Sequence, residues 1–470
     1  MHTPAPSDDR SRIDTIVSLC KRRGFVFPSS EIYGGINALY DFGPIGTRLR
    51  RNIRNSWWRY MVDSRDDVEG IETSVIMNPK VWEASGHVQN FTDPLVDCLG
   101  KCKKRWREDH LEDERRARKL PEGSTGCPEC GGDLTPARQF NLMFKSYLGP
   151  IEDSAAQVWL RPETAQGMFV NFANVVTTSR AKIPFGIAQI GKGFRNEISP
   201  GNFIFRSREF ELMEMEFFCE PGTDNEWYAF WKKYRFDWYL DELGIQESHL
   251  RIREHEKAEL SHYSSGTSDI EYAFPFGWGE LEGVACRTDF DLTTHQKMSG
   301  KDLSYFDPKK EIHYVPHVIE PAVSVDRIFL TVLVDAYEEE QVNGEERVVL
   351  RLHPDLAPYQ VAVLPLSKNE QLMQQAHEIE KSLRPTFATA YDDTQSIGKR
   401  YRRHDEIGTP LAVTVDFDTL EDHAVTIRNR DSMTQDRVAI ADLIPAIEAQ
   451  LDRARRDSRA RSHGTGITKE

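Results

Sequence analysis

Hydrophobic and polar residues alternate along residues 185–218, and this alternation predicts two long strands joined by a turn. The second half, "FRSREFELMEMEFF", changes along its length from arginines through aromatic residues to glutamates. Because alternate side chains of a strand share a face, one face is expected to carry Arg206, Arg208, Phe210, Leu212, Glu214 and Glu216. The opposite face is expected to be apolar, with Phe203, Phe205, Met213, Met215 and Phe217.

Such a charged face suits a ligand with phosphates at one end, a stackable ring in the middle and an ammonium group at the other. Arg195 and Glu197, before the turn "SPGN" at 199–202, share parity and extend this surface. The alternative is a set of cross-strand ion pairs on a solvent-facing sheet, which is common and weakly stabilising. The apolar opposite face favours a charged face that looks inward to a cavity, but the pattern alone leaves both interpretations open.

The rest of the first 350 residues mixes helices and strands. Apolar residues at helical spacing predict helices at 10–24, 43–62, 224–243 and, largely apolar and buried, 325–339. Strands are expected at 70–79, at several places within 249–292, and at 313–322. Residues 98–140 change to charged helix and Cys-rich, Gly-rich knuckles, which indicates a small insertion.

Beyond residue 351 strands and helices alternate, which is typical of a separate α/β domain on a mixed sheet. The expected elements are strands at 361–366, 388–393, 411–417 and 424–431, with helices at 369–383, at 397–408 and from about 436. The predicted fold class is α+β, with an antiparallel-sheet domain over 1–350, an α/β domain over 355–452 and a flexible basic tail over 453–470.

The chain has 470 residues and a formal net charge of −15, which argues against binding nucleic acid over its whole surface. Basic segments at 101–107, 398–404 and 453–462 are candidate local contacts, with solvated charge runs as the alternative. No apolar run approaches the roughly 18 residues of a membrane span, and the N-terminal sequence has no apolar signal core. A cytoplasmic protein with no membrane partner is therefore expected.

Four of the seven cysteines fall close together, at Cys98, Cys102, Cys127 and Cys130. In a reducing compartment this clustering points to metal rather than disulfides, and the spacing is compatible with a tetrahedral zinc site. Four unligated thiols are the alternative. Cys20, Cys219 and Cys286 are expected to be buried small hydrophobes.

The chain has no P-loop or Rossmann fingerprint, so nucleotide chemistry would need another phosphate cradle. The segment "FRNEISPGNFIFRSREF" resembles motif 2 of the class II aminoacyl-tRNA synthetases and, in detail, that of the homodimeric glycyl-tRNA synthetases. Further segments match the same family in the same order: "EIYGGINALYDFGPIG", "WEASGHVQNFTDPLVDC", "RPETAQGMFVNF", "WGELEGVACRTDFDL", "HVIEPAVSVDRI" and "IGKRYRRHDEIGTPLAVTVDFD". The resemblance covers about 10–450.

This resemblance implies a class II catalytic domain with a Cys-rich insertion, followed by an anticodon-binding domain. It implies a glycine–tRNA ligase that forms glycyl-adenylate from glycine and ATP, with Mg²⁺, and passes glycine to the 3′ end of tRNA-Gly. The family's other features, a homodimer paired through 43–79 and tRNA contact by 398–404, are expected as well. Any zinc would be structural.

The resemblance also implies residue roles at the ATP site. Arg195 is expected to bridge the α-phosphate and the glycine carboxylate, Arg327 to hold the γ-phosphate and lie over the adenine, and Glu280 to hold Mg²⁺. Phe210 is expected to stack beneath the adenine and Glu197 to read its amino group. The full expected ATP set is Arg195, Asn196, Glu197, Phe205, Arg206, Ser207, Arg208, Glu209, Phe210, Glu280, Leu281, Ser324, Val325, Asp326 and Arg327.

For glycine, the resemblance implies that Glu163 and Glu214 accept the ammonium group, since the ligand cation compensates carboxylates on an apolar strand. The expected glycine set is Arg107, Glu163, Phe210, Glu211, Leu212, Met213, Glu214, Glu320, Pro321, Ala322, Val323 and Ser324. Motif 3 departs from the family here: where many relatives have "EPSxG", this chain has "EPAVS". A hydroxyl contact expected at 322 is therefore missing.

Two alternatives remain. One is a related class II synthetase for proline or threonine, against which "RPETAQG" together with "FELMEMEFF" favours glycine. The other is a non-catalytic, synthetase-like binding protein, which predicts decayed motifs, whereas Arg195, Glu197 and Arg327 are all present.

Overall fold

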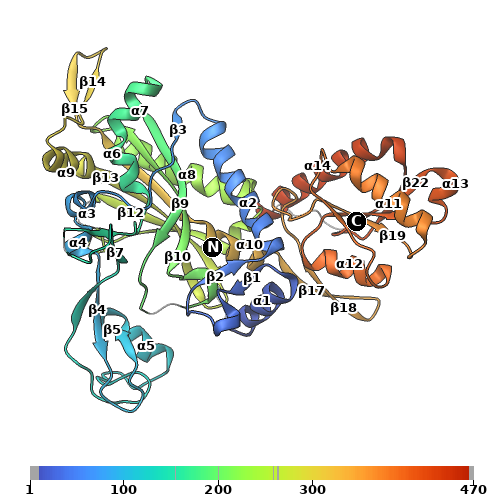
Figure 1. Ribbon diagram of the computed structural model, residues 1–470, viewed down its shortest axis with the longest axis horizontal. Helices are drawn as coiled ribbons and strands as arrows, with labels where there is room; N and C mark the ends of the chain where they lie inside the picture. Colours follow the sequence, from blue (N-terminus) through green and yellow to red (C-terminus); the bar gives the residue numbers. More distant parts are fainter. Residues whose placement is uncertain (1–9, 154, 199–200, 258, 262–263, 465–470) are drawn as a thin grey trace.

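A computed structural model describes residues 10–153, 155–198, 201–257, 259–261 and 264–464. Figure 1 shows three parts: a central body, a small lobe that extends from it, and a C-terminal domain on the other side. The body holds the long strands of the molecule, and it positions the site described below. The turn residues Ser199 and Pro200 of the predicted hairpin lie outside the described residues.

The body is built on a seven-stranded sheet in the order β11-β12-β13-β16-β10-β9-β3. Neighbouring strands are antiparallel except β3 and β9. The strands are β3 (Val68–Gly70), β9 (Phe185–Phe194), β10 (Glu209–Cys219), β11 (Leu250–Glu254), β12 (Gly266–Phe274), β13 (Gly277–Thr288) and β16 (His317–Ser324). The predicted hairpin is thus β9 and β10, and the register places Glu214 of β10 opposite Ala322 of β16.

Helices cover both faces of this sheet. Consecutive residues of β10 point to opposite sides, so they pack against different helices. Phe217 packs in the main core with helices on one face, and Phe218 packs in a second core with helices on the other. The first face carries α1 (Arg10–Arg23), α2 (Pro44–Trp58), α8 (Asp224–Asp241) and α10 (Val325–Ala336). The second carries α6 (Ala165–Val170), α7 (Phe172–Ser179) and α9 (Phe290–Ser299). These shorter helices leave room on the second face for a cavity.

Small elements complete the body. Their bounds are β1 (Val26–Pro28), β2 (Tyr40–Phe42), a π-helix (Arg59–Asp63), α3 (Pro79–Ala84), α4 (His87–Asn90), β7 (Lys145–Tyr147), β8 (Gln157–Trp159), β14 (Tyr305–Asp307), β15 (Ile312–Tyr314), β17 (Tyr337–Val342) and β18 (Glu345–Leu350). Short 3₁₀ turns lie in the body at Glu31–Tyr33, Phe203–Phe205 and Glu247–His249. Two more lie outside the body, at Glu108–His110 and Ile440–Asp442.

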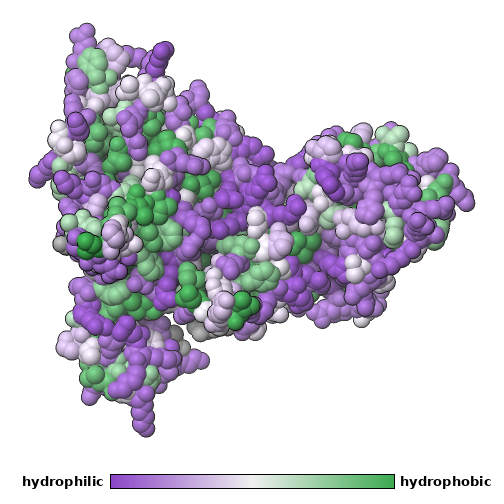
Figure 2. Space-filling view, in the orientation of Figure 1, coloured by the Kyte–Doolittle hydropathy of each residue, from purple (hydrophilic) through white to green (hydrophobic). Residues whose placement is uncertain are grey.

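The predicted insertion is a lobe of its own, here called the Cys lobe and defined as residues 92–141 (Figure 1). It contains the three-stranded sheet β5-β4-β6 and one helix. The bounds are β4 (Thr92–Asp97), β5 (Arg105–Arg107), α5 (Leu111–Ala117) and β6 (Arg138–Asn141). The lobe therefore starts earlier than the predicted 98, because β4 belongs to its sheet. Figure 2 shows hydrophobic surface on the body near the base of the lobe.

The C-terminal domain is the predicted α/β unit on a mixed sheet, ordered β20-β19-β21-β22-β23. Strand β19 pairs in parallel with β20 and β21, and the remaining pairs are antiparallel. The bounds are β19 (Val361–Pro365), α11 (Glu370–Leu383), β20 (Thr389–Tyr391), α12 (Ile397–Glu406), β21 (Leu411–Val415), α13 (Thr419–Asp422), β22 (Ala424–Asn429), β23 (Gln435–Ala439) and α14 (Leu443–Ser462).

Several predictions of secondary structure are wrong. Residues 70–79 form no continuous strand: β3 ends at Gly70, a single bridge joins Ile76 to Leu160, and Pro79 begins α3, where its missing N–H costs nothing. The last helix begins at Leu443 and not near 436, because β23 intervenes.

The expected flexible tail is helical from 453 to Ser462, because its arginines find acidic partners on the body. Arg455 pairs with Asp355 at 2.8 Å, and Arg459 pairs with Asp241 at 2.8 Å. Residues 465–470 lie outside the described part of the chain. A search of the described residues for helices long and apolar enough to cross a membrane finds none.

Candidate active site

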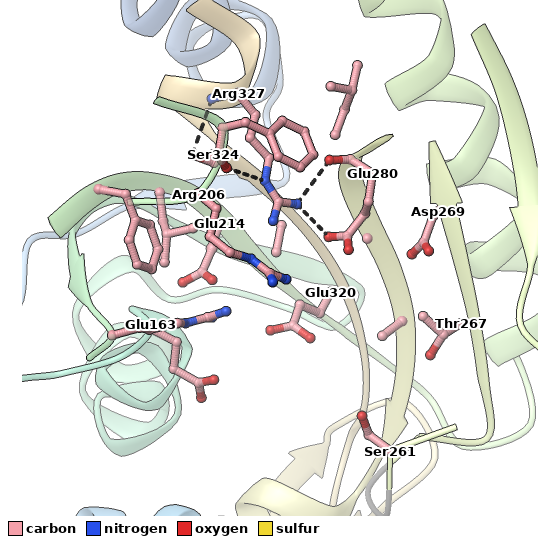
Figure 3. A pocket seen from close by; sticks show the side chains of 18 of the residues that line it. Glu163, Arg206, Glu214, Ser261, Thr267, Asp269, Glu280, Glu320, Ser324 and Arg327 are labelled. Atoms are coloured by element: carbon pink, nitrogen blue, oxygen red, sulfur yellow. Dashed lines mark hydrogen bonds and ion pairs between the residues drawn. The ribbon is translucent and has the colours of Figure 1, made fainter. Parts of the chain in front are cut away.

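A cavity of about 430 Å³ opens on the second face of the large sheet, within the usual size range of small-molecule sites. Arg195 and Glu214 line this same cavity, so the charged face of the hairpin looks inward as predicted. Figure 3 shows its two ends: Glu280 and Arg327 lie at one, and Glu163, Glu214 and Glu320 at the other. We call the first the arginine end, defined by Arg195, Arg206 and Arg327, and the second the carboxylate end, defined by those last three glutamates.

Arg195 of the arginine end is held by few contacts. Its Nε donates to the carbonyl oxygen of Pro162 at 3.1 Å. Its guanidinium carbon lies 5.2 Å from the ring centre of Phe210 and 5.4 Å from that of Phe91, a cation–π arrangement. Arg206 is 3.9 Å from Glu197, too far for a hydrogen bond. Both arginines therefore keep donors that can turn to an anionic ligand.

Arg327 and Glu280 face each other across the arginine end (Figure 3). Nη1 of Arg327 lies 3.0 Å from Oε1 of Glu280, and its guanidinium carbon lies 4.7 Å from the ring centre of Phe205. The charge of Arg327 lowers the pKa of Glu280 and keeps it ionised. The Glu280 side chain is 50% exposed, so the pair is open to ligands.

Hydrogen bonds orient the glutamates of the carboxylate end. Oε2 of Glu214 accepts from the backbone N–H of Thr164 at 2.6 Å and also from the Thr164 hydroxyl. Glu163 accepts from Nε2 of His87 at 3.0 Å and from Nε2 of Gln166 at 3.0 Å. Burial would raise the pKa of Glu163, but His87 and Arg287 lower it well below its usual range. Burial raises the pKa of Glu214, and the charge of Glu163 adds to the rise.

A chain of buried hydrogen bonds joins Glu163 to Glu320, and we call it the buried bridge, made of Gln166, Asp291 and Arg287. Gln166 donates to Asp291 at 3.0 Å, and Arg287 binds Asp291 through two nitrogens at 2.7 and 2.9 Å. Nη1 of Arg287 then reaches Glu320 at 2.9 Å. Because Gln166, Asp291 and Arg287 are all buried, the bridge fixes the two carboxylates relative to each other.

Most of the predicted site residues line the cavity: Glu163, Arg195, Glu197, Phe205, Arg206, Ser207, Phe210, Leu212, Glu214, Glu280, Leu281, Glu320, Ala322, Ser324 and Arg327. Ser324 also caps α10, since its hydroxyl oxygen accepts from the backbone N–H of Arg327 at 3.5 Å. Phe205 was expected on the apolar back but turns to the cavity, because it belongs to a 3₁₀ turn before β10 begins.

The other predicted residues lie elsewhere. Those on the opposite face of their strands, or buried behind them, are Glu211, Met213, Pro321, Val323, Val325 and Asp326. Glu211 pairs with Arg54 at 3.1 Å there. Glu216 keeps the parity of the charged face but is fully buried beyond the cavity. Side chains thus alternate between the two faces within β10. Consecutive residues such as those from 210 to 214 therefore cannot all face one ligand.

Positions outside the strands also depart from the prediction. The Arg208 guanidinium donates to the carbonyl oxygens of Glu197 and Asn37, since the strand pattern begins only at Glu209. The backbone of Asn196 donates to Leu142, and Glu209 pairs with Lys192 outside the cavity. Arg107 lies in the Cys lobe, where it pairs with Asp93 at 3.1 Å.

The sequence analysis missed several residues at this site. His255, Ser261, Thr267 and Asp269 line the far side of the cavity, and Arg287 lines its carboxylate end. The remainder stand behind it: Thr164, Gln166, Asp291 and His295, whose Nε2 lies 2.7 Å from Oε1 of Gln166. A sequence signal existed for some of them, because Asp269 and Arg287 are charged residues within predicted strands of the catalytic domain.

The Cys lobe gathers the sulfurs of Cys98, Cys102, Cys127 and Cys130 within 4.8 Å of one another. Gly100 and Gly132 allow this close approach, because a Cβ on Gly132 would lie 2.6 Å from Cα of Gly100 and would clash with it. Four thiolates at this spacing match a tetrahedral site for a soft divalent metal. The other cysteines, Cys20, Cys219 and Cys286, are buried as predicted.

The basic segment 398–404 lies on α12, and much of it faces inward. Arg400 is buried and donates to the backbone carbonyl oxygens of Pro365, Leu366 and Asp392. Arg403 pairs with Asp392, and burial lowers the pKa of His404 to about 4. These residues hold the domain together, so the segment is not the solvated charge run that was the alternative interpretation. Lys399 remains exposed.

Comparisons with known proteins agree with this architecture. Residues 147–337 match the family model "tRNA synthetase class II core domain (G, H, P, S and T)", and residues 360–450 match "Anticodon binding domain". A glycine–tRNA ligase of Mycolicibacterium vanbaalenii is 54% identical over 95% of this chain and 99% of its own length. One of Acetivibrio thermocellus is 52% identical over 94% and 99%, and one of Streptomyces coelicolor is 56% identical over 91% and 96%.

Proposed function

The chain belongs to the glycine–tRNA ligase family of class II aminoacyl-tRNA synthetases, and from this premise we propose how its cavity performs the reaction. It is an ATP-dependent ligase that joins glycine to tRNA for protein synthesis. One observation carries the proposal for the site: a single cavity holds arginines at one end and oriented carboxylates at the other. That polarity matches a triphosphate next to a small zwitterion.

The first step joins two anions, since the glycine carboxylate attacks the α-phosphorus of ATP and pyrophosphate leaves. Arg195 is proposed to neutralise both the carboxylate and the α-phosphate, because its positive charge acts on Glu214 at the carboxylate end as well as on Glu280 at the arginine end. Arg206 and Arg327 are placed to hold the outer phosphates, and the rings of Phe205 and Phe210 to hold the adenine. The second step passes the glycyl group to a terminal hydroxyl of tRNA and releases AMP.

Mg²⁺ is the metal that class II synthetases use with ATP, and Glu280 fits it. Its carboxylate is half exposed at the arginine end, and Mg²⁺ usually takes one or two carboxylates together with phosphate oxygens. When bound there, Mg²⁺ would supply positive charge that offsets the negative charge of the phosphates. Arg327, already 3.0 Å from Glu280, orients that carboxylate.

The carboxylate end reads the ammonium group of glycine. Glu214 offers Oε1 to the ligand, because Thr164 occupies its other oxygen. Glu163 and Glu320 approach from opposite sides, and the buried bridge sets their spacing. Ala322 supplies no hydroxyl, so the carboxylates alone compensate the ammonium charge.

Glycine-dependent exchange of pyrophosphate into ATP tests this proposal. We expect exchange with glycine and none with alanine or serine, and charging of tRNA-Gly in the full reaction. Exchange with proline or threonine would favour a related synthetase, and no exchange with any amino acid would favour a binding protein.

We also propose that the four cysteines of the Cys lobe bind a structural Zn²⁺. Purified protein is expected to contain about one zinc per chain by atomic absorption. Cys130→Ser is expected to lose the metal and to make the lobe sensitive to trypsin, while glycine-dependent exchange persists, since the sulfurs line no part of the cavity. A metal-free wild type with a protease-resistant lobe would contradict this.

The C-terminal domain is proposed to contact the tRNA anticodon in the cytoplasm, with Lys399 as one exposed cation on α12. A homodimer is proposed through residues 43–79. Its support is apolar surface in the preceding 3₁₀ turn, where Ile32 and Tyr33 are 88% and 87% exposed. Light scattering is expected to give twice the chain mass, and a monomer at micromolar concentration would contradict it.

A further inference from the structure

One wall of the cavity, formed by strand β12, supplies none of the groups proposed to hold glycine or ATP. Asp269 and Thr267 of this strand line the cavity, and Figure 3 shows them across it from Glu163 and Glu214. We call these two residues of β12 the β12 wall. A carboxylate and a hydroxyl oxygen both accept hydrogen bonds, and a carboxylate repels phosphates. The β12 wall therefore suits the hydroxyl groups of a ligand.

The strand register places the β12 wall opposite the carboxylate end of the cavity. One row across the sheet consists of Glu214 of β10, Ala322 of β16, Gly283 of β13 and Asp269 of β12. Neighbouring strands lie about 4.8 Å apart, so the backbones at Glu214 and Asp269 are roughly 14 Å apart. The two residues between them are small, and both line the cavity. The row is therefore a trough with a low floor and a carboxylate on each side.

The Asp269 carboxylate is held through one oxygen and open at the other. Its Oδ2 lies 2.7 Å from Nε2 of His255, which also lines the cavity. Its Oδ1 accepts no hydrogen bond from any residue that the structure describes. The atom nearest to a Cβ placed on Gly283 would be this same Oδ1, at 3.9 Å. Oδ1 therefore overhangs open space above the floor of the trough, where a ligand can reach it.

We propose that Asp269 binds a hydroxyl group of the terminal ribose of tRNA, and that His255 is the positioning residue that orients Asp269. This proposal rests on the proposed glycine activity. Glu214 holds the ammonium group on one side of the trough. The glycyl carbonyl carbon is two bonds from that nitrogen, so it stays near the floor, where a ribose held by Asp269 can meet it. The ribose of ATP also enters the cavity, but the groups proposed to hold ATP lie at the arginine end.

The contact acts in the transfer of glycine to tRNA. A terminal hydroxyl oxygen of the ribose forms a bond to the glycyl carbonyl carbon. The bond between that carbon and the phosphate oxygen breaks, AMP leaves with its electron pair, and the hydroxyl proton passes to the AMP phosphate. Asp269 takes no proton: it accepts a hydrogen bond from a ribose hydroxyl and so holds the sugar in position for attack. Loss of this contact slows transfer and leaves formation of glycyl-adenylate unchanged.

The test separates the two steps in the full-length protein. Glycine-dependent pyrophosphate exchange reports the first step, and single-turnover transfer from preformed glycyl-adenylate to tRNA-Gly reports the second. In Asp269→Asn the side-chain oxygen is taken by His255, so an amide N–H donor faces the ribose in place of an acceptor. Transfer is expected to slow about 30-fold, while kcat and both KM values in exchange stay within about twofold of the wild type.

Two further variants test the role of His255. His255→Ala removes the donor that orients Asp269 and is expected to slow transfer about tenfold. His255→Gln keeps an N–H donor and is expected to stay within about threefold of the wild type, a recovery that a purely structural role would not give. The matched control is Asp224→Asn, because Asp224 also pairs with a histidine, His317, but lies outside the cavity. Both steps should be unchanged in this control.

Two results overturn the proposal. One is transfer by Asp269→Asn at the wild-type rate. The other is a rise in its KM for ATP as large as its loss of transfer, since Asp269 would then contact ATP. Absence of exchange by the wild type would instead defeat the proposed function. If Asp269→Asn does not fold, the His255 variants decide: slow transfer in His255→Ala with recovery in His255→Gln supports the proposal, and transfer that does not differ between them overturns it.

Discussion

The two ends of the cavity are built in opposite ways. At the arginine end the side chains are partly exposed, and Arg206 is loosely held: it is 33% exposed, and the Glu197 oxygen that it faces is 3.9 Å away. At the carboxylate end Glu214 is 3% exposed, and two donors of Thr164 hold one of its oxygens. The ends thus differ in how much of their geometry exists before a ligand arrives.

The difference follows from what each end must bind. A triphosphate is large, strongly hydrated and brings several charges, so flexible cations can close on it when it arrives. Glycine offers only an ammonium group and a carboxylate, so its site must be rigid to discriminate at all. We therefore expect changes at the arginine end to affect ATP and catalysis, and changes at the carboxylate end to affect the KM for glycine.

The largest effect is expected for Arg195→Ala, because Arg195 serves both ends. Without its guanidinium the two reacting anions repel each other, and kcat/KM for glycine-dependent exchange should fall about 1,000-fold. Arg116→Ala, which removes a 75% exposed arginine of the Cys lobe, should leave exchange unchanged. Exchange that survives in the Arg195 variant would mean that neither end depends on it.

The next largest effect is expected for Glu214→Gln at the carboxylate end. An amide keeps the shape but cannot compensate a buried ammonium charge, so kcat/KM for glycine should fall about 100-fold. The KM for ATP should stay within about twofold of the wild type. A rise in the KM for ATP as large as the fall in kcat/KM for glycine would show that the two ends act as one unit.

A smaller effect is expected for Gln166→Leu, which cuts the buried bridge without touching the ligand. Leucine removes one hydrogen-bond donor from Glu163 and one from Asp291, and the KM for glycine should rise about tenfold with a lowered melting temperature. Gln374→Leu, at an exposed glutamine of α11, is the control. Normal glycine kinetics in the Gln166 variant would show that the carboxylates need no bridge.

The smallest effect is expected for Phe210→Leu at the arginine end. Leucine fills part of the volume but removes the flat ring that lies 5.2 Å from Arg195, so the KM for ATP should rise about threefold. Phe306→Leu, at a 48% exposed ring of β14, should change neither constant. A larger change in the KM for glycine than for ATP would place Phe210 at the other end.

Much of this site could be predicted from one hairpin. Alternation along β10 placed Phe210, Leu212 and Glu214 on one face, because a strand has a side-chain period of two. The same rule failed for Arg208, since the chain before Glu209 is not a strand. Glu211 and Met213 were assigned to glycine by resemblance, and their own parity places them on the opposite face.

The sequence by itself determined the family, through its ordered motifs, and the order of the domains and the spacing of the cysteines, because these depend on local residue order. Its periodicity favoured an inward charged face of the hairpin but left the solvent-facing alternative open. Only the tertiary structure decided which distant side chains meet. In the bridge from Glu163 to Glu320, Gln166 meets Asp291 from 125 residues away, and Arg455 of the expected tail meets Asp355 from 100 residues away. Such contacts depend on how whole elements pack, since a buried charge must find its partner wherever the fold brings one.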